Sequence, residues 1–87
     1  MRRISFEGNT FKDYIEWSKD KKTLKKIIKL LEESRRTPFD GTAKPEILKH
    51  EKKTICSRRI NDKDRLVYEV KDDEIIITRL KGHYKDK

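Results

Sequence analysis

The sequence predicts an α+β domain in which two N-terminal helices pack on one face of a largely antiparallel sheet of four or five strands. Three observations predict this fold class. An alternating run comes first, two stretches with helical periodicity follow, and the second half holds strand-like runs separated by turn-forming residues. The predicted order is β-α-α-β-β-β with one optional extra strand. Since helices cover only one side of the sheet, we look for function on the other side.

The first strand and the first helix are short. Residues 3–6 alternate, with Ile4 and Phe6 on one side, and Gly8-Asn9 then interrupts the strand. Thr10 followed by Asp13 resembles a capping box, which predicts that a helix begins there. One face of this helix carries Phe11, Tyr14, Ile15 and Ser18.

The second helix has a strong apolar stripe. Asp20 is placed to cap its N-terminus. The stripe consists of Leu24, Ile27, Ile28 and Leu31, with Leu30 beside it, and we expect it to face the core. The opposite surface is rich in lysine: Lys21, Lys22, Lys25, Lys26 and Lys29. These lysines form either a solvated face or a surface for a polyanion.

The second half of the chain is predicted to be sheet. Pro38 ends the helical pattern, and Asp40-Gly41 favours a turn. Three strands are then expected, at residues 55–60, 65–70 and 74–81, with turn-prone pairs between them. Residues 46–50, which read EILKH, are the optional strand.

Composition indicates one small domain with an anionic partner. The chain has 87 residues, of which 24 are Lys or Arg and 16 are Asp or Glu, so the net charge is +8. The excess is spread over both halves, and a basic folded domain favours nucleic acid as a partner, with an acidic protein or a membrane as the second choice. The single cysteine, Cys56, is expected to be a packing residue in a reducing compartment. We expect a cytoplasmic protein, because the N-terminus lacks the apolar run of a signal peptide and no apolar run is long enough to span a membrane.

Strand alternation gathers charge on the face without helices. In residues 65–70, Leu66, Tyr68 and Val70 are assigned to the core, which leaves Arg65 on the other face. In the last strand Ile76, Thr78 and Leu80 are assigned to the core. Ile75, Ile77, Arg79, Lys81 and His83 are then assigned to the free face. The run "ICSRRI" does not alternate, so the side of Arg59 stays open. This face is either a solvated basic surface or a phosphate-binding concavity.

The residues available for chemistry are few. The sequence has no glycine-rich phosphate loop, and two histidines are too few for a zinc site, so no metal or cofactor is expected. RNA cleavage by the internal 2′-hydroxyl needs only a base, an acid and cations. Glu46 is the candidate base and His83 the candidate acid. Arg59 and Arg65 are the candidate phosphate clamp.

Five motifs occur in order along most of the chain: RRTPFDG, KPEILKH, SRRI, RLVY and a late HY. In this order they resemble the YoeB/Txe toxins of the RelE/ParE superfamily. The resemblance implies the RelE-like microbial RNase fold. It also implies a single toxin domain over residues 1–87, with 85–87 as a short C-terminal extension.

The resemblance implies a toxin of a type II toxin–antitoxin system. Such toxins are ribosome-dependent endoribonucleases, are metal-independent, and cut mRNA in the ribosomal A site. The implied partners are an antitoxin of the YefM/Axe type, the 70S ribosome and mRNA. A homodimer is a further hypothesis, and no membrane is involved. Two alternatives stay open: a non-catalytic toxin of the ParE type, and a basic module that binds RNA or the ribosome without chemistry.

The resemblance also assigns roles. Glu46 matches the general base, His83 the general acid and Arg65 the residue that stabilises the transition state. Arg59 matches a phosphate contact and Tyr84 the terminal aromatic residue. Further RNA contacts are expected at Lys44, Lys49, Arg58, Arg79 and Lys81. The chain departs from many relatives in two places: Cys56 replaces an aromatic residue before SRRI, and Lys85-Asp86-Lys87 follow HY.

Overall fold

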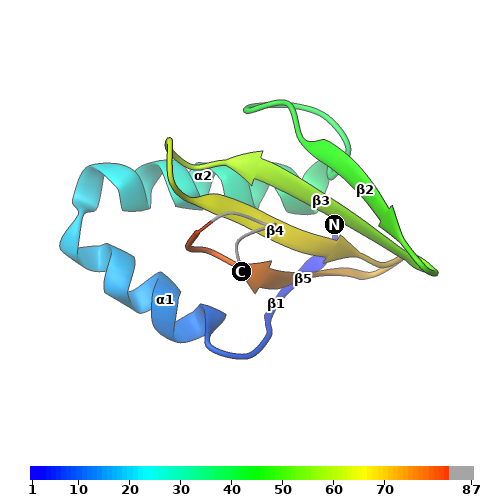
Figure 1. The fold of residues 1–87 in the computed structure, drawn as a ribbon, viewed down its shortest axis with the longest axis horizontal. Coiled ribbons are helices and arrows are strands. Elements are labelled where there is room, and N and C mark those ends of the chain that lie inside the picture. Colours follow the sequence, from blue (N-terminus) through cyan, green and yellow to red (C-terminus); the bar gives the residue numbers. More distant parts are fainter. Residues whose placement is uncertain (83–87) are drawn as a thin grey trace.

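The computed structural model describes residues 1–82, and within them the predicted α+β class is confirmed (Figure 1). The elements are β1 (Arg3–Phe6), α1 (Thr10–Glu16), a 3₁₀ turn (Trp17–Lys19), α2 (Lys21–Arg36), β2 (Glu46–His50), β3 (Lys53–Arg59), β4 (Arg65–Val70) and β5 (Glu74–Arg79). The optional strand at residues 46–50 therefore forms. None of the helices in this part of the chain is long and apolar enough to cross a membrane.

The five strands form one mixed sheet in the order β1-β5-β4-β3-β2. Strands β2 to β5 pair antiparallel with their neighbours, whereas β1 pairs parallel with β5. The helices carry the chain from β1 to β2 at the far edge, and successive antiparallel pairings return it to β5. Both helices lie on the same side of the sheet, so the other face carries no helix (Figure 1).

The core lies between α2 and the sheet. The helix contributes Ile27, Leu30 and Leu31, and the second half contributes Cys56, Ile60, Leu66, Tyr68, Ile75, Ile77 and Leu80. Cys56 is fully buried as a free thiol, and burial raises its pKa, so its predicted packing role is confirmed. The indole Nε1 of Trp17 donates a hydrogen bond to the carbonyl oxygen of Leu80 at 3.0 Å, which ties the turn after α1 to the end of β5.

The two helix starts differ from each other. The Asp20 carboxylate accepts a hydrogen bond from the backbone amide of Thr23 at 3.1 Å, as predicted for a cap. The prediction of a capping box at Thr10 is wrong. The buried hydroxyl of Thr10 donates hydrogen bonds to the carbonyl oxygens of Glu7 and Ile77 instead of capping the helix. That hydroxyl therefore attaches α1 to β5.

The parity prediction for β5 is partly wrong, because the strand contains a one-residue bulge. Tyr68 pairs with Ile77 while the adjacent Val67 pairs with Arg79, so Thr78 is the extra residue. Ile75 and Ile77 are fully buried in the core rather than on the free face. After the bulge the alternation is shifted by one residue. Arg79 therefore lies on the same side as its partner Val67, and Leu80 is buried, so both residues are on the sides that the sequence predicted.

Candidate active site

A polar hollow lies on the helix-free face of the sheet. It has a volume of about 220 Å³ and is lined by Ala43, Lys44, Glu46, Ser57, Arg59 and Arg65. Four predicted site residues thus meet in one place: Glu46, Lys44, Arg59 and Arg65. One carboxylate faces three cationic side chains, so the hollow is suited to a phosphate with an adjacent proton acceptor.

Strand register explains why these residues meet. Glu46 on β2 pairs with Ser57 on β3, and Ser57 pairs with Val67 on β4. Two residues after Ser57 on β3, Arg59 pairs with Arg65 on β4. Partners in an antiparallel pair point to the same side, and so do residues two apart on one strand. The side of Arg59, which the sequence left open, is therefore the side of Glu46.

Arg65 is held in place by its own loop. Its Nη1 donates to the carbonyl oxygens of Asn61 at 2.8 Å and Asp64 at 3.2 Å. The side-chain oxygen of Asn61 stabilises this loop, because it accepts hydrogen bonds from the backbone amides of Lys63 and Asp64. A half-buried guanidinium with two such contacts is preorganised for an anion.

Arg59 is held much less firmly. Its side chain is 62% exposed, and within residues 1–82 its one ion pair is with the fully exposed Asp62, at 3.9 Å. Exposed pairs of this length contribute little free energy. The guanidinium of Arg59 is therefore available to a ligand.

The end of the described chain is fastened beside Arg65. The carbonyl oxygen of Gly82 accepts the backbone amide of Arg65 at 3.0 Å, and the amide of Gly82 donates to the Asp64 carboxylate at 2.8 Å. The predictions for His83, Tyr84 and residues 85–87 lie outside the described residues.

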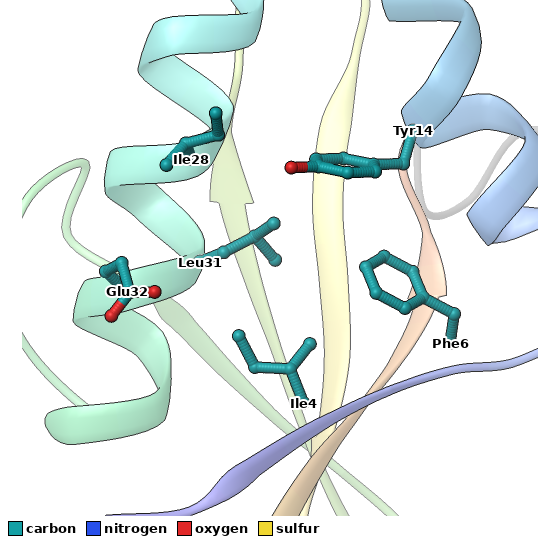
Figure 2. Close-up of a pocket in the computed structure, with 6 residues that line it drawn as sticks. All are labelled: Ile4, Phe6, Tyr14, Ile28, Leu31 and Glu32. Atoms are coloured by element: carbon teal, nitrogen blue, oxygen red, sulfur yellow. The ribbon is translucent and has the colours of Figure 1, made fainter.

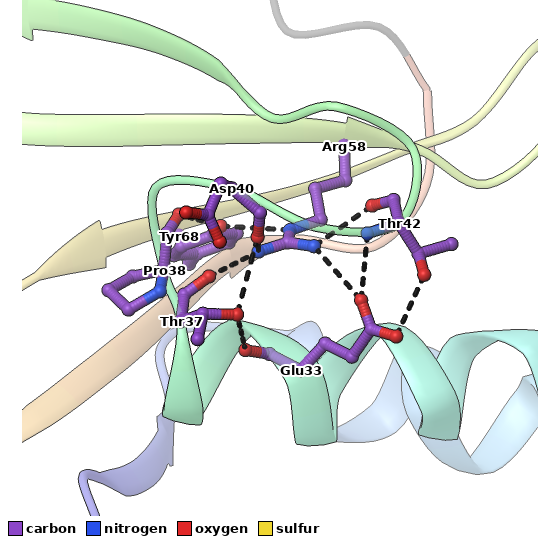
Figure 3. Close-up of polar contacts among 7 residues, drawn as sticks. All are labelled: Glu33, Thr37, Pro38, Asp40, Thr42, Arg58 and Tyr68. Carbon is purple, nitrogen blue, oxygen red and sulfur yellow. Dashed lines mark hydrogen bonds and ion pairs between the residues drawn. The ribbon is translucent and has the colours of Figure 1, made fainter.

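Arg58 is not an RNA contact, and this prediction is corrected. Arg58 pairs with Leu66 on the helix side of the sheet and is fully buried, whereas Arg59 points the other way. Its guanidinium is already used by the fold, since it donates to the carbonyl oxygens of Thr37, Asp40 and Thr42 (Figure 3).

The other three predicted RNA contacts do not line the hollow. Alternation along β2 places the exposed Lys49 on the side opposite Glu46. The Nζ of Lys81 lies 2.6 Å from the Glu16 carboxylate, and this hydrogen bond raises the pKa of Lys81 and lowers that of Glu16. Arg79 lines a separate hollow with Thr78 and Lys81, next to the start of α1.

Sequence reasoning missed Ser57 and Ala43 as lining residues. Ser57 sits directly opposite Glu46, a relation that only the strand register reveals. No group of three or more side chains able to hold a metal ion occurs among residues 1–82.

A second, apolar groove lies between the two helices and β1. It is about 170 Å³ in volume and is lined by Ile4, Phe6, Tyr14, Ile28, Leu31 and Glu32. Figure 2 shows the rings of Phe6 and Tyr14 facing Ile28 and Leu31 across it. Ile28 is 42% exposed, which corrects its assignment to the core stripe, and Phe11 and Ile15 on α1 are more than half exposed.

The fold and the hollow define a small basic α+β protein with a cationic, carboxylate-containing site on the open face of its sheet. A family model described as the YoeB-like toxin of bacterial type II toxin–antitoxin systems matches residues 6–84. Toxin YoeB of Escherichia coli (strain K12) is 42% identical over 83 residues, which cover 94% of this chain and 99% of that protein. The chain therefore belongs to the YoeB toxin family.

Two solved structures from Staphylococcus aureus support the same assignment. A YoeB dimer matches with a TM-score of 0.83 at 42% identity and covers 95% of this chain and 98% of that one. A heterotetrameric YoeB–YefM toxin–antitoxin complex matches with a TM-score of 0.81 at 42% identity and covers 97% of this chain and 99% of that one.

Proposed function

We propose that the protein is a ribosome-dependent endoribonuclease that cleaves mRNA in the A site and thereby inhibits translation. The observation that carries this proposal is the hollow in which Glu46 faces Arg59 and Arg65. A carboxylate beside two guanidiniums is what 2′-hydroxyl attack on a phosphodiester requires, and no metal ion is needed for it.

In the proposed reaction Glu46 takes the proton of the 2′-hydroxyl, and the oxygen attacks the adjacent phosphorus. Negative charge grows on the non-bridging oxygens, where Arg65 and Arg59 stabilise it. The bond to the 5′-oxygen breaks as that oxygen receives a proton from His83. The products are a 2′,3′-cyclic phosphate and a 5′-hydroxyl end. Lys44 contacts a neighbouring phosphate.

The position of Gly82 supports His83 as the general acid. Gly82 is hydrogen-bonded to the backbone of Arg65 and to the side chain of Asp64. His83 is the residue that follows Gly82 in the sequence. A histidine can donate and recover a proton near neutral pH. We assign Tyr84 as the terminal aromatic residue of the same site.

The lysines of α2 support the proposal that the protein acts while bound to the ribosome. Lys21, Lys22, Lys25, Lys26 and Lys29 are exposed, and within residues 1–82 none of them is in an ion pair. The first turn of α2 has no acidic residue beyond the N-cap Asp20, so its exposed surface is basic. The protein thus has a basic helix on one side of the sheet and a cationic hollow on the other. A partner that surrounds the protein with RNA, as a ribosome does, contacts both sides.

We propose an antitoxin of the YefM type as the protein partner, and the apolar groove as part of its docking surface. The support is twofold: a relative has been solved as a YoeB–YefM complex, and this chain exposes apolar side chains around the groove. Contiguous exposed apolar surface marks protein interaction sites. A homodimer is a second assembly that the S. aureus dimer supports.

The proposed function is tested by mapping the 5′ ends of transcripts after induction of the wild type, Glu46→Gln and His83→Ala. We expect new ends within translated codons for the wild type only, while both variants stay folded by circular dichroism. Unchanged cleavage by both variants would overturn the assignment of base and acid. Growth arrest with intact transcripts would instead favour a non-catalytic toxin.

A further inference from the structure

We propose that Arg58 is a positioning residue of the active site. It fastens the segment of residues 37–44 to the sheet, and this segment carries Lys44 and leads into Glu46. The set of contacts is called the Arg58 clamp and comprises Glu33, Thr37, Pro38, Asp40, Thr42, Arg58 and Tyr68. The consequence for catalysis rests on the proposed function, whereas the structural part does not.

The guanidinium of Arg58 is the centre of the clamp (Figure 3). Its Nη1 donates to the Thr42 carbonyl oxygen at 2.9 Å, and its Nη2 donates to those of Thr37 at 2.8 Å and Asp40 at 2.9 Å. Three carbonyls of one irregular segment thus converge on one buried cation. Because hydrogen bonds from a charged group are stronger than neutral ones, three of them from one fixed guanidinium constrain the path of the segment.

Tyr68 and Glu33 complete the clamp from the sheet and from α2. The Tyr68 hydroxyl accepts Nε of Arg58 at 3.0 Å and donates to the Pro38 carbonyl oxygen at 2.6 Å. The Glu33 carboxylate accepts the Thr42 amide at 2.8 Å and the Thr42 hydroxyl at 2.7 Å. These hydrogen bonds, and then the charge of Arg58 at 3.6 Å, lower the pKa of Glu33 and keep it ionised.

The backbone immediately after the clamp is strained. Ala43 has φ 66° and Lys44 has φ 31°, conformations that residues other than glycine rarely adopt. Strain of this kind persists only where the surroundings impose it. Both residues line the active-site hollow, and Pro45 with its fixed φ connects them to Glu46. The clamp therefore ends where the wall of the hollow begins.

The clamp also links the two faces of the sheet. Arg58 and Arg59 are neighbours on β3, so the residue that holds the segment and a residue that binds phosphate share one strand. A lysine in place of Arg58 has the charge but not the planar fork of five N–H donors that serves this many acceptors. The geometry thus requires arginine at position 58.

The test compares two matched threonine-to-valine substitutions. Each removes a hydroxyl that donates a hydrogen bond to a carboxylate, Glu33 in α2 in one case and its N-cap Asp20 in the other. Thr42→Val removes one hydroxyl hydrogen bond to Glu33 at 2.7 Å. Thr23→Val removes one to Asp20, also at 2.7 Å, and neither Thr23 nor Asp20 lines the hollow. In both, the backbone amide keeps its bond to the same carboxylate. The readouts are amide hydrogen exchange at Lys44, whose amide donates to Gly41, and single-turnover cleavage of ribosome-bound mRNA.

Thr42→Val is expected to speed exchange at Lys44 about 10-fold, the effect of losing a hydrogen bond to a charged group. It lowers the cleavage rate about 10-fold or more without changing the RNA concentration for half-maximal rate, because misplacement of catalytic groups has effects of that size. Thr42→Ser restores both, and Thr23→Val changes neither. Arg58→Lys, if it folds, loses at least as much activity as Thr42→Val.

Unchanged exchange at Lys44 in Thr42→Val would overturn the clamp. Equal cleavage by Thr42→Val and Thr23→Val would overturn its role in positioning. If the wild type cuts no RNA, the proposed function fails, and the exchange comparison alone then decides whether the clamp holds the segment.

Discussion

Replacing two neighbouring arginines by methionine should have very different effects on stability, large for Arg58 and small for Arg59. Arg58 is fully buried on the helix side of the sheet, and Arg59 is exposed on the other side. The two substitutions make the same chemical change one residue apart. Any difference between them therefore reports the environment of each side chain.

The expected loss for Arg58→Met is large. The change removes the Arg58 hydrogen bonds to three backbone carbonyls and to the Tyr68 hydroxyl, and it removes the ion-pair partner of Glu33. Removing one partner of a buried pair costs about 3–5 kcal/mol. A domain of this length has a total stability of about 4–13 kcal/mol. The variant should therefore lose about a quarter or more of its stability.

Arg59→Met should be close to neutral for stability. It loses one exposed ion pair of 3.9 Å, which contributes about 0–1 kcal/mol. It should, however, abolish most RNA cleavage, because it removes a cation from the hollow.

Urea unfolding followed by Trp17 fluorescence and circular dichroism measures both free energies. Equal midpoints for Arg58→Met and Arg59→Met would refute the placement of the two side chains on opposite faces.

Three further predictions concern pH, the ribosome and the antitoxin. The pKa of Glu33 is lowered in the folded state, so the stability it contributes is present at neutral pH and is lost as the pH falls below the ordinary glutamate value and through the lowered one. Thr42→Val, which removes the largest cause of that shift, should flatten the acid dependence of the urea midpoint; an unchanged acid dependence would contradict this account of Glu33. Replacing Lys21, Lys25 and Lys29 by glutamine should weaken ribosome binding and make it less dependent on salt, measured by co-sedimentation at several salt concentrations, and an unchanged salt dependence would place the contact elsewhere. Ile28→Glu should weaken antitoxin binding in calorimetry while RNA cleavage by the free toxin stays normal; unaltered affinity would exclude the groove as a docking surface.

The order of elements could be predicted because local patterns determine it. The helical run of α2, the cap at Asp20 and the strand runs are all local signals, and each element formed. The helix-free face was also correctly expected to gather arginines, since alternation along β4 decides the side of Arg65.

The errors came from contacts that are distant in the sequence. The bulge at Thr78 depends on how β5 pairs with β4, and it reverses the alternation that was used to assign Ile75 and Ile77. Thr10 donates to a carbonyl 67 residues away instead of capping its own helix. Arg58 and Arg59 are the same residue type in one run, so only the sheet register shows which of them is buried.

The end groups of the RNA products test the central claim most directly. Attack by the 2′-hydroxyl, with Glu46 as base and Arg59 and Arg65 around the phosphate, leaves a 2′,3′-cyclic phosphate and a 5′-hydroxyl. An mRNA with a single 2′-deoxynucleotide at the cleavage site should therefore resist the ribosome-bound toxin, and the all-ribose mRNA should give 5′-hydroxyl ends. Products with 5′-phosphate ends, or cleavage at the deoxynucleotide, would contradict the account.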